Sequence, residues 1–102
     1  MILEEPKYDV ESIKKTLSSD VESLVEYSNM LKGLIANFEQ DILNTREKAA
    51  VFLKSGQKEN YGYLMEKIQE TEMRIKTCWG CVAECETQIA HKKDLLRMYV
   101  LF

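Results

Sequence analysis

The sequence is poor in the residues that make turns. Its 102 residues include one proline and four glycines. An all-β fold needs a turn about every 8 to 12 residues, so this composition argues against it. The length excludes a second domain, because single domains commonly run to about 100 to 150 residues. We therefore expect one all-α domain over residues 1–102.

The chain also lacks an excess of positive charge and any long apolar run. It holds 14 basic and 17 acidic residues, a net charge of -3. Nucleic-acid backbones and anionic membranes attract basic surfaces, so we expect no nucleic-acid partner. No stretch of about 18 residues is free of charge, so we expect no membrane insertion. Residues 1–9 do not resemble a secretory signal, which predicts an intracellular, cytoplasmic protein.

The sequence has only one histidine. The single histidine, His91, lies about 240° around a helix from Cys85, and no serine or cysteine lies within a turn of it. The four glycines stand alone, so no glycine-rich phosphate loop is present. We therefore expect no enzyme activity, no catalytic residues, no cofactor and no small-molecule substrate.

The three cysteines, Cys78, Cys81 and Cys85, are an odd number in one short segment, which does not fit a secreted disulfide framework. Two interpretations remain open. Clustered thiols can bind a metal or sense redox state, although structural zinc takes four ligands and this cluster offers three. Alternatively, the cysteines are small apolar residues of a helix seam, with no metal bound. We favour the second interpretation.

Apolar residues recur every seven positions in both halves of the chain. The row from Val10 to Phe52 is apolar at six of its seven positions, and a second row four residues later is partly apolar. A third row, three residues after the first, contains Tyr27 and Leu34 but is half polar. In the second half the row is apolar throughout: Tyr61, Ile68, Ile75, Val82, Ile89 and Leu96. Such repeats predict two long coiled-coil helices.

A turn separates these two halves. Gly56 suits the left-handed position that ends a helix, so we predict helices at about residues 9–55 and 60–100 with a turn at about 56–59. Asp9 is the expected N-cap of the first helix, and Asn60 or a neighbour that of the second. Residues 1–26 hold seven acids and three bases (-4), whereas residues 91–102 hold three bases and one acid (+2). This asymmetry favours an antiparallel hairpin, which brings the two ends together.

A hairpin with this turn sets facing positions at residue numbers that sum to about 116. Leu34 should then pack near Val82. Gly33 and Gly80 should lie at nearly the same height, and two interpretations of this pairing remain open. The helices approach closely there or leave room for Trp79, or the two glycines are merely tolerated.

The apolar stripes are too wide for two helices to cover each other, so we expect self-association into a homodimeric four-helix bundle or docking to another helical protein. The resulting hypothesis is a non-enzymatic scaffold, adaptor, chaperone or inhibitor. The expected interface comprises Leu24, Leu31, Ile35, Phe38, Ile42, Ile75, Trp79, Val82, Ile89, Leu96, Tyr99, Val100, Leu101 and Phe102.

Overall fold

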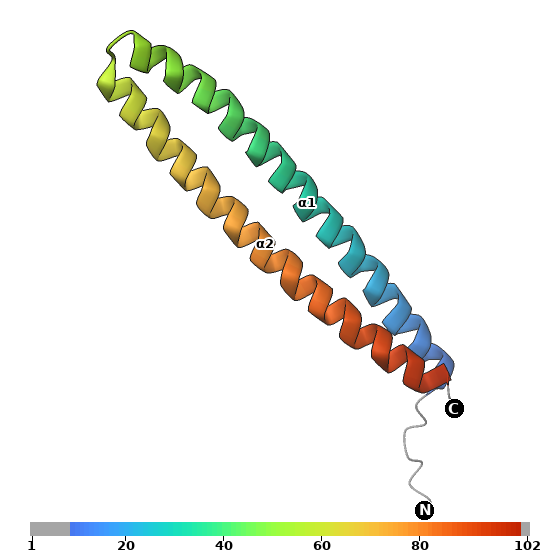
Figure 1. The fold of residues 1–102 in the computed structure, drawn as a ribbon. Coiled ribbons are helices and arrows are strands. Elements are labelled where there is room, and N and C mark those ends of the chain that lie inside the picture. The colour runs from blue at the N-terminus through green and yellow to red at the C-terminus, as the bar shows by residue number, and fades with distance from the viewer. Residues whose placement is uncertain (1–8, 101–102) are drawn as a thin grey trace, which may run out of the picture.

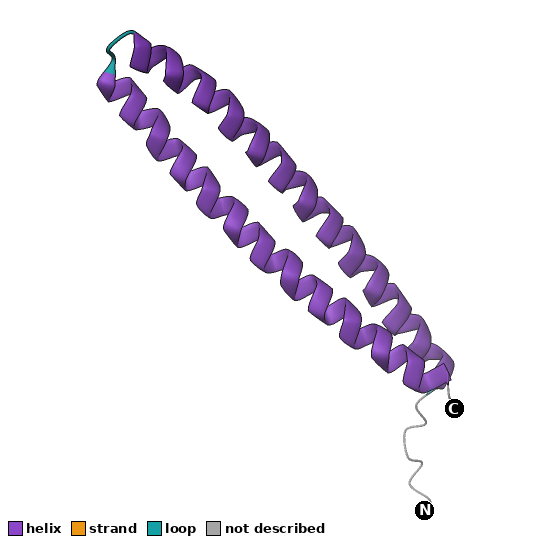
Figure 2. Ribbon diagram, viewed as in Figure 1, coloured by secondary structure: helices purple, strands orange, loops and turns teal. Residues whose placement is uncertain are grey.

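The computed structural model describes residues 9–100, with the side chain of Val100 excepted. This part of the chain is an antiparallel hairpin of α1 (Val10–Lys54) and α2 (Lys58–Val100), measuring 69 × 14 × 13 Å. The start of α1 lies beside the end of α2, opposite the connecting loop (Figure 1). Figure 2 shows that this short loop is the only non-helical segment between the two helices. The prediction of an all-α helical hairpin is confirmed.

Asp9 caps the start of α1, as predicted. Its backbone is extended (φ -72°, ψ 110°), and one carboxylate oxygen accepts a hydrogen bond of 3.0 Å from the Glu11 N–H. The other carboxylate oxygen accepts a bond of 3.1 Å from the Ser12 hydroxyl. The first N–H groups of a helix have no partner within the helix, so this cap satisfies one of them.

Gly56 ends α1 in the left-handed conformation, with φ at 72°. The Gly56 N–H donates to the Leu53 carbonyl at 3.2 Å, and the Gln57 N–H donates to the Phe52 carbonyl at 2.9 Å. These two bonds form a Schellman motif, which pairs carbonyls that the end of a helix leaves free. The expected role of Gly56 is therefore confirmed.

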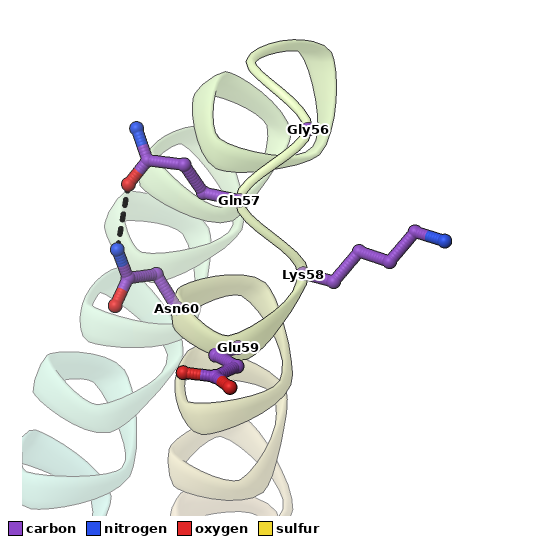
Figure 3. Close-up of a pocket in the computed structure, with 5 residues that line it drawn as sticks. All are labelled: Gly56, Gln57, Lys58, Glu59 and Asn60. Carbon is purple, nitrogen blue, oxygen red and sulfur yellow. Dashed lines mark hydrogen bonds between the residues drawn. The ribbon is translucent and has the colours of Figure 1, made fainter.

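The second helix begins at Lys58, two residues before the predicted boundary. The turn is complete at Gln57, whose carbonyl already accepts the Tyr61 N–H at 3.0 Å. Asn60 therefore lies inside the first turn of α2 and is not its N-cap. Its side-chain amide donates to Gln57 Oε1 at 2.6 Å and ties the loop to the helix (Figure 3).

The core is a narrow seam between the two helices. At its centre Leu31, Ile35 and Val82 form a buried cluster, against which the half-buried Ile75 and Cys78 pack. The other buried side chains continue this seam toward both sides: Ser28, Ile42, Ala49, Ile68 and Cys85.

On α1, the row of residues that contains Leu34 was predicted to lie in the seam, and the structure shows a different row there. Leu34 was expected against Val82, but it is exposed, and Leu31 and Ile35 pack there instead. The row of Leu34 also contains Asp41 and Lys48, and burying it would remove these charges from water. The helix is therefore rotated so that Ile35 and the row on its side of the helix face α2.

Three salt bridges between α1 and α2 show how the two helices are aligned along their length. They join Asp20 to Lys92 at 3.3 Å, Lys32 to Glu86 at 3.6 Å and Arg46 to Glu72 at 3.4 Å. The residue numbers of these pairs sum to 112, 118 and 118, on either side of the predicted 116. The pair Asp20–Lys92 also joins the acidic start to the basic end, as the charge asymmetry predicted.

Gly33 and Gly80 do not lie where the two helices pack against each other. A Cβ atom added at either glycine would meet no other atom within 4 Å. Close approach of the two backbones therefore does not explain them. The structure supports the simpler interpretation of two glycines tolerated on the outer surface.

Candidate interaction surfaces

Two long sides of the hairpin flank the seam, and one is crossed by the ion pairs Lys32–Glu86 and Arg46–Glu72. We call it the ion-pair face and define it by Lys32, Arg46, Glu72, Trp79 and Glu86. Trp79 lies seven residues from each of the two glutamates that form the salt bridges, so it shares their side of α2. Trp79 is 48% exposed. Trp79 was expected at an interface, and within the hairpin it is not part of the seam.

The other side, the thiol face, is hollowed. Tyr27 and Cys81 line an open hollow of about 220 Å³ together with Leu24, Glu84, Cys85 and Gln88. Steps of seven residues extend this side along both helices, since such steps stay on one side of a helix. The thiol face is accordingly defined by Tyr27, Leu34, Asp41 and Lys48 on α1 and by Lys67, Arg74, Cys81 and Gln88 on α2.

The thiol face changes character along its length. Its half near the loop carries a polar hollow of about 450 Å³, lined by Asp41, Asn44, Thr45, Lys48, Lys67, Glu70, Thr71 and Arg74. The middle of this face carries Tyr27, Met30 and Leu34, which are 46%, 53% and 40% exposed. Because these three residues follow the spacing i, i+3 and i+7, they form one continuous stripe on α1, which we call the apolar stripe.

The cysteines behave mainly as small apolar side chains. Cys85 is buried, and Cys78 and Cys81 are half-buried and pack against the central cluster. Cys81 differs in also lining the hollow beside Tyr27. Among residues 9–100, no group of three or more His, Cys, Asp or Glu side chains is arranged to hold a metal ion. The proposed ligand set of Cys78, Cys81 and Cys85 therefore gains no support from the geometry.

The other expected interface residues are buried, half-buried or outside the described residues. Leu31, Ile35, Ile42 and Val82 are buried in the seam. The half-buried ones are Leu24, Phe38, Ile75, Ile89, Leu96 and Tyr99. Leu101, Phe102 and the side chain of Val100 lie outside the described residues.

The sequence interpretation missed the apolar stripe because it assigned Leu34 to the seam, although it placed Met30 off the seam among the apolar residues that need a partner. The exposure of Leu34 could have been predicted from the charged residues in the same seven-residue row. Asp20, Asp41 and Lys48 share the row of Tyr27 and Leu34, and a row that contains several charged side chains is a poor candidate for burial.

Neither described helix contains a segment long and apolar enough to cross a membrane. Compared with known proteins, the chain matches no family, no curated protein and no solved structure.

Proposed function

We propose that this chain is a non-enzymatic protein–protein interaction module, acting as a scaffold, adaptor, chaperone or inhibitor through the outer surfaces of its hairpin. The observation that carries the proposal is the apolar stripe of Tyr27, Met30 and Leu34. Single exposed apolar residues are ordinary on protein surfaces, but a continuous stripe at i, i+3 and i+7 is the pattern with which helices engage other helices and grooves.

The stripe is available because the seam is already complete without it. Full burial of a Leu or Met side chain contributes about 1.5 to 3 kcal/mol. Because these side chains are about half exposed, burial of the exposed half by a partner would contribute about half of that free energy. Other large apolar side chains add to the exposed surface of both helices: Val10, Val25, Leu43, Val51, Leu53, Tyr63, Met73, Trp79 and Met98. The proposed partners are a second copy of the chain, another helical protein, or both.

The proposal includes a cytoplasmic location. Three free cysteines lie within eight residues of one helix, and free thiols in this number suit a reducing compartment.

The test is site-specific photo-crosslinking of the full chain in cells. A photo-reactive phenylalanine derivative replaces Tyr27 in one variant and Gln40 in the control. Gln40 follows the buried Leu31 by nine residues, so it lies on the opposite side of α1. We expect adducts of discrete mass from position 27 and none from position 40. Absence of adducts at position 27, with the variant expressed and helical, would refute an interaction role for this surface.

A further inference from the structure

We infer that Cys81 and Cys85 form a two-coordinate site for a soft monovalent metal ion, of which Cu(I) is the biological example. The inference goes beyond the proposed function, because it assigns a chemical ligand to the thiol face and does not depend on a protein partner. Both cysteines are free and line the same open hollow of about 220 Å³. Cys78 packs against the central cluster and is not part of the lining of this hollow. The three cysteines therefore divide into a pair that shares an accessible space and a third outside it.

The spacing of the two thiols suits a bridging ion. Residues four apart on a helix are neighbours, with Cβ atoms about 5 to 6 Å apart. Thiolate bonds to a metal such as zinc are about 2.3 Å long, so two sulfurs on opposite sides of one ion lie roughly 4.6 Å apart. Staggered rotamers of both side chains can supply this separation from a regular helix. Because α2 is continuous from Lys58 to Val100, the helix holds the two cysteines at this spacing.

The same spacing is unfavourable for a disulfide. A disulfide requires Cβ atoms about 3.5 to 4.5 Å apart, closer than successive turns of a helix bring them. Formation of the bond would therefore distort α2 at Cys85 and Val82, which are buried in the seam. The geometry of this pair thus favours metal binding over redox sensing.

The number of ligands selects the class of ion. Among residues 9–100, no three His, Cys, Asp or Glu side chains are arranged around a common ion position. Zinc takes four ligands and calcium takes about six to eight oxygen ligands, so neither ion fits a pair of thiols. Thiolates prefer soft ions such as Cu(I), and this ion accepts two ligands in a line. Glu84 also lines the hollow, and its carboxylate adds negative charge that attracts a cation.

Binding exchanges protons for the ion without oxidation or reduction. Each thiol releases its proton to the solvent, two sulfur–copper bonds form, and the copper remains Cu(I). On its inner side the site is closed by the seam, because Cys85 is only 6% exposed. On its outer side the hollow is flanked by Leu24 and Tyr27 and gives the ion a path of entry. An apolar surrounding of this kind limits the access of water to the bound ion.

The first test is an anaerobic competition titration of the purified full chain with Cu(I) against the coloured Cu(I) chelator bicinchoninate. Ascorbate serves as the reductant, because thiol reductants would compete for the ion. We expect one Cu(I) per chain. Cys81→Ala should lower the affinity at least about tenfold, because it removes one of only two ligands. The matched control is Cys78→Ala, which removes the thiol outside the hollow and should leave the affinity unchanged. Circular dichroism should show unchanged helix content for both variants.

The second test counts the ligands by X-ray absorption at the copper edge. The parent chain loaded with one Cu(I) should show two sulfur neighbours and the edge feature of two-coordinate Cu(I). Cys85→Ala removes the other proposed ligand and should lose binding in the same titration. Because Cys85 is buried, its substitution can also destabilise the hairpin. If circular dichroism shows a loss of helix in Cys85→Ala, the half-buried Cys81→Ala and the sulfur count decide the assignment.

Each other outcome overturns a defined part of the inference. No transfer of Cu(I) to the parent chain, or equal affinity of the parent chain and Cys81→Ala, would refute the site. Loss of binding in Cys78→Ala, or three sulfur neighbours, would refute the two-coordinate assignment. One Cu(I) per two chains, with a dimer mass by light scattering, would refute a site within a single helix. Photo-crosslinking at Tyr27 tests the proposed function independently of all these results.

Discussion

At the scale of single residues, the glycines of this chain divide by backbone conformation. Gly56 has φ at 72°, where an L side chain is strained, and the hydrogen bonds of the turn depend on that conformation. Gly33, Gly62 and Gly80 lie inside helices, and a Cβ at any of them would enter open space. The first glycine is required by the fold, whereas the other three only weaken it.

Substitution by alanine should therefore change stability in opposite directions. Gly33→Ala and Gly80→Ala should each raise the free energy of unfolding by about 0.5 to 1 kcal/mol, because alanine restricts the unfolded chain and suits a helix. Gly56→Ala should lower it by about 1 to 2 kcal/mol, the cost of the left-handed conformation for an L residue. Urea unfolding at one fixed protein concentration measures all three. A destabilising Gly80→Ala would mean that the helices approach more closely there than the structure shows.

The neighbours Leu34 and Ile35 show where sequence reasoning succeeds and where it stops. Both are large and apolar, and the seven-residue count correctly assigned rows of such residues to the hairpin. Choosing which row is buried required weighing the whole row, and Asp41 and Lys48 decide against that of Leu34. The same limit applies to the cysteines, since spacing alone could not show that Cys85 is buried while Cys81 lines a hollow.

At the scale of the elements, the seam holds the helices together, and the cross-helix ion pairs contribute little. Exposed pairs such as Lys32–Glu86 and Arg46–Glu72 are worth about 0 to 1 kcal/mol each. Burial of the central cluster contributes more, because Val82 is 2% exposed and packs directly against Leu31 and Ile35. The helices and their turn were predictable from periodicity and Gly56, whereas the start of α2 depended on hydrogen bonds that no local motif announces.

A charge in the seam should separate the hairpin. Val82→Asp would place a carboxylate among Leu31, Ile35 and Ile75 without a partner, so we expect a loss of more than about 3 kcal/mol in the free energy of unfolding. Val25→Asp makes the same substitution at a 38% exposed position and should change stability by about 0.5 kcal/mol or less. Thermal unfolding followed by circular dichroism compares the two. Equal stability of the two variants would contradict the seam.

At the scale of the whole molecule, burial is uneven along the hairpin. Within the part of the chain that the structure describes, the buried side chains of α1 run from Ser28 to Ala49, and those of α2 from Ile68 to Cys85. Toward the open end, the side chains of residues 10–27 and 86–99 are only half-buried or exposed. A hairpin with this distribution should open from its free end, because local stability follows the buried apolar contacts of each segment.

Hydrogen–deuterium exchange at two protein concentrations tests this gradient together with the proposed binding of a second copy. At low concentration, amides of residues 10–27 and 86–100 should exchange faster than those of residues 28–49 and 68–85, since fewer buried contacts hold the open end closed. If a second copy binds the apolar stripe, exchange there should be slower at high concentration, because ligand binding to the folded state adds to its stability. Leu34→Glu should keep the gradient and lose the concentration dependence. Uniform exchange along both helices at low concentration would contradict the uneven burial, and protection independent of concentration in the parent chain would contradict a second copy as the partner.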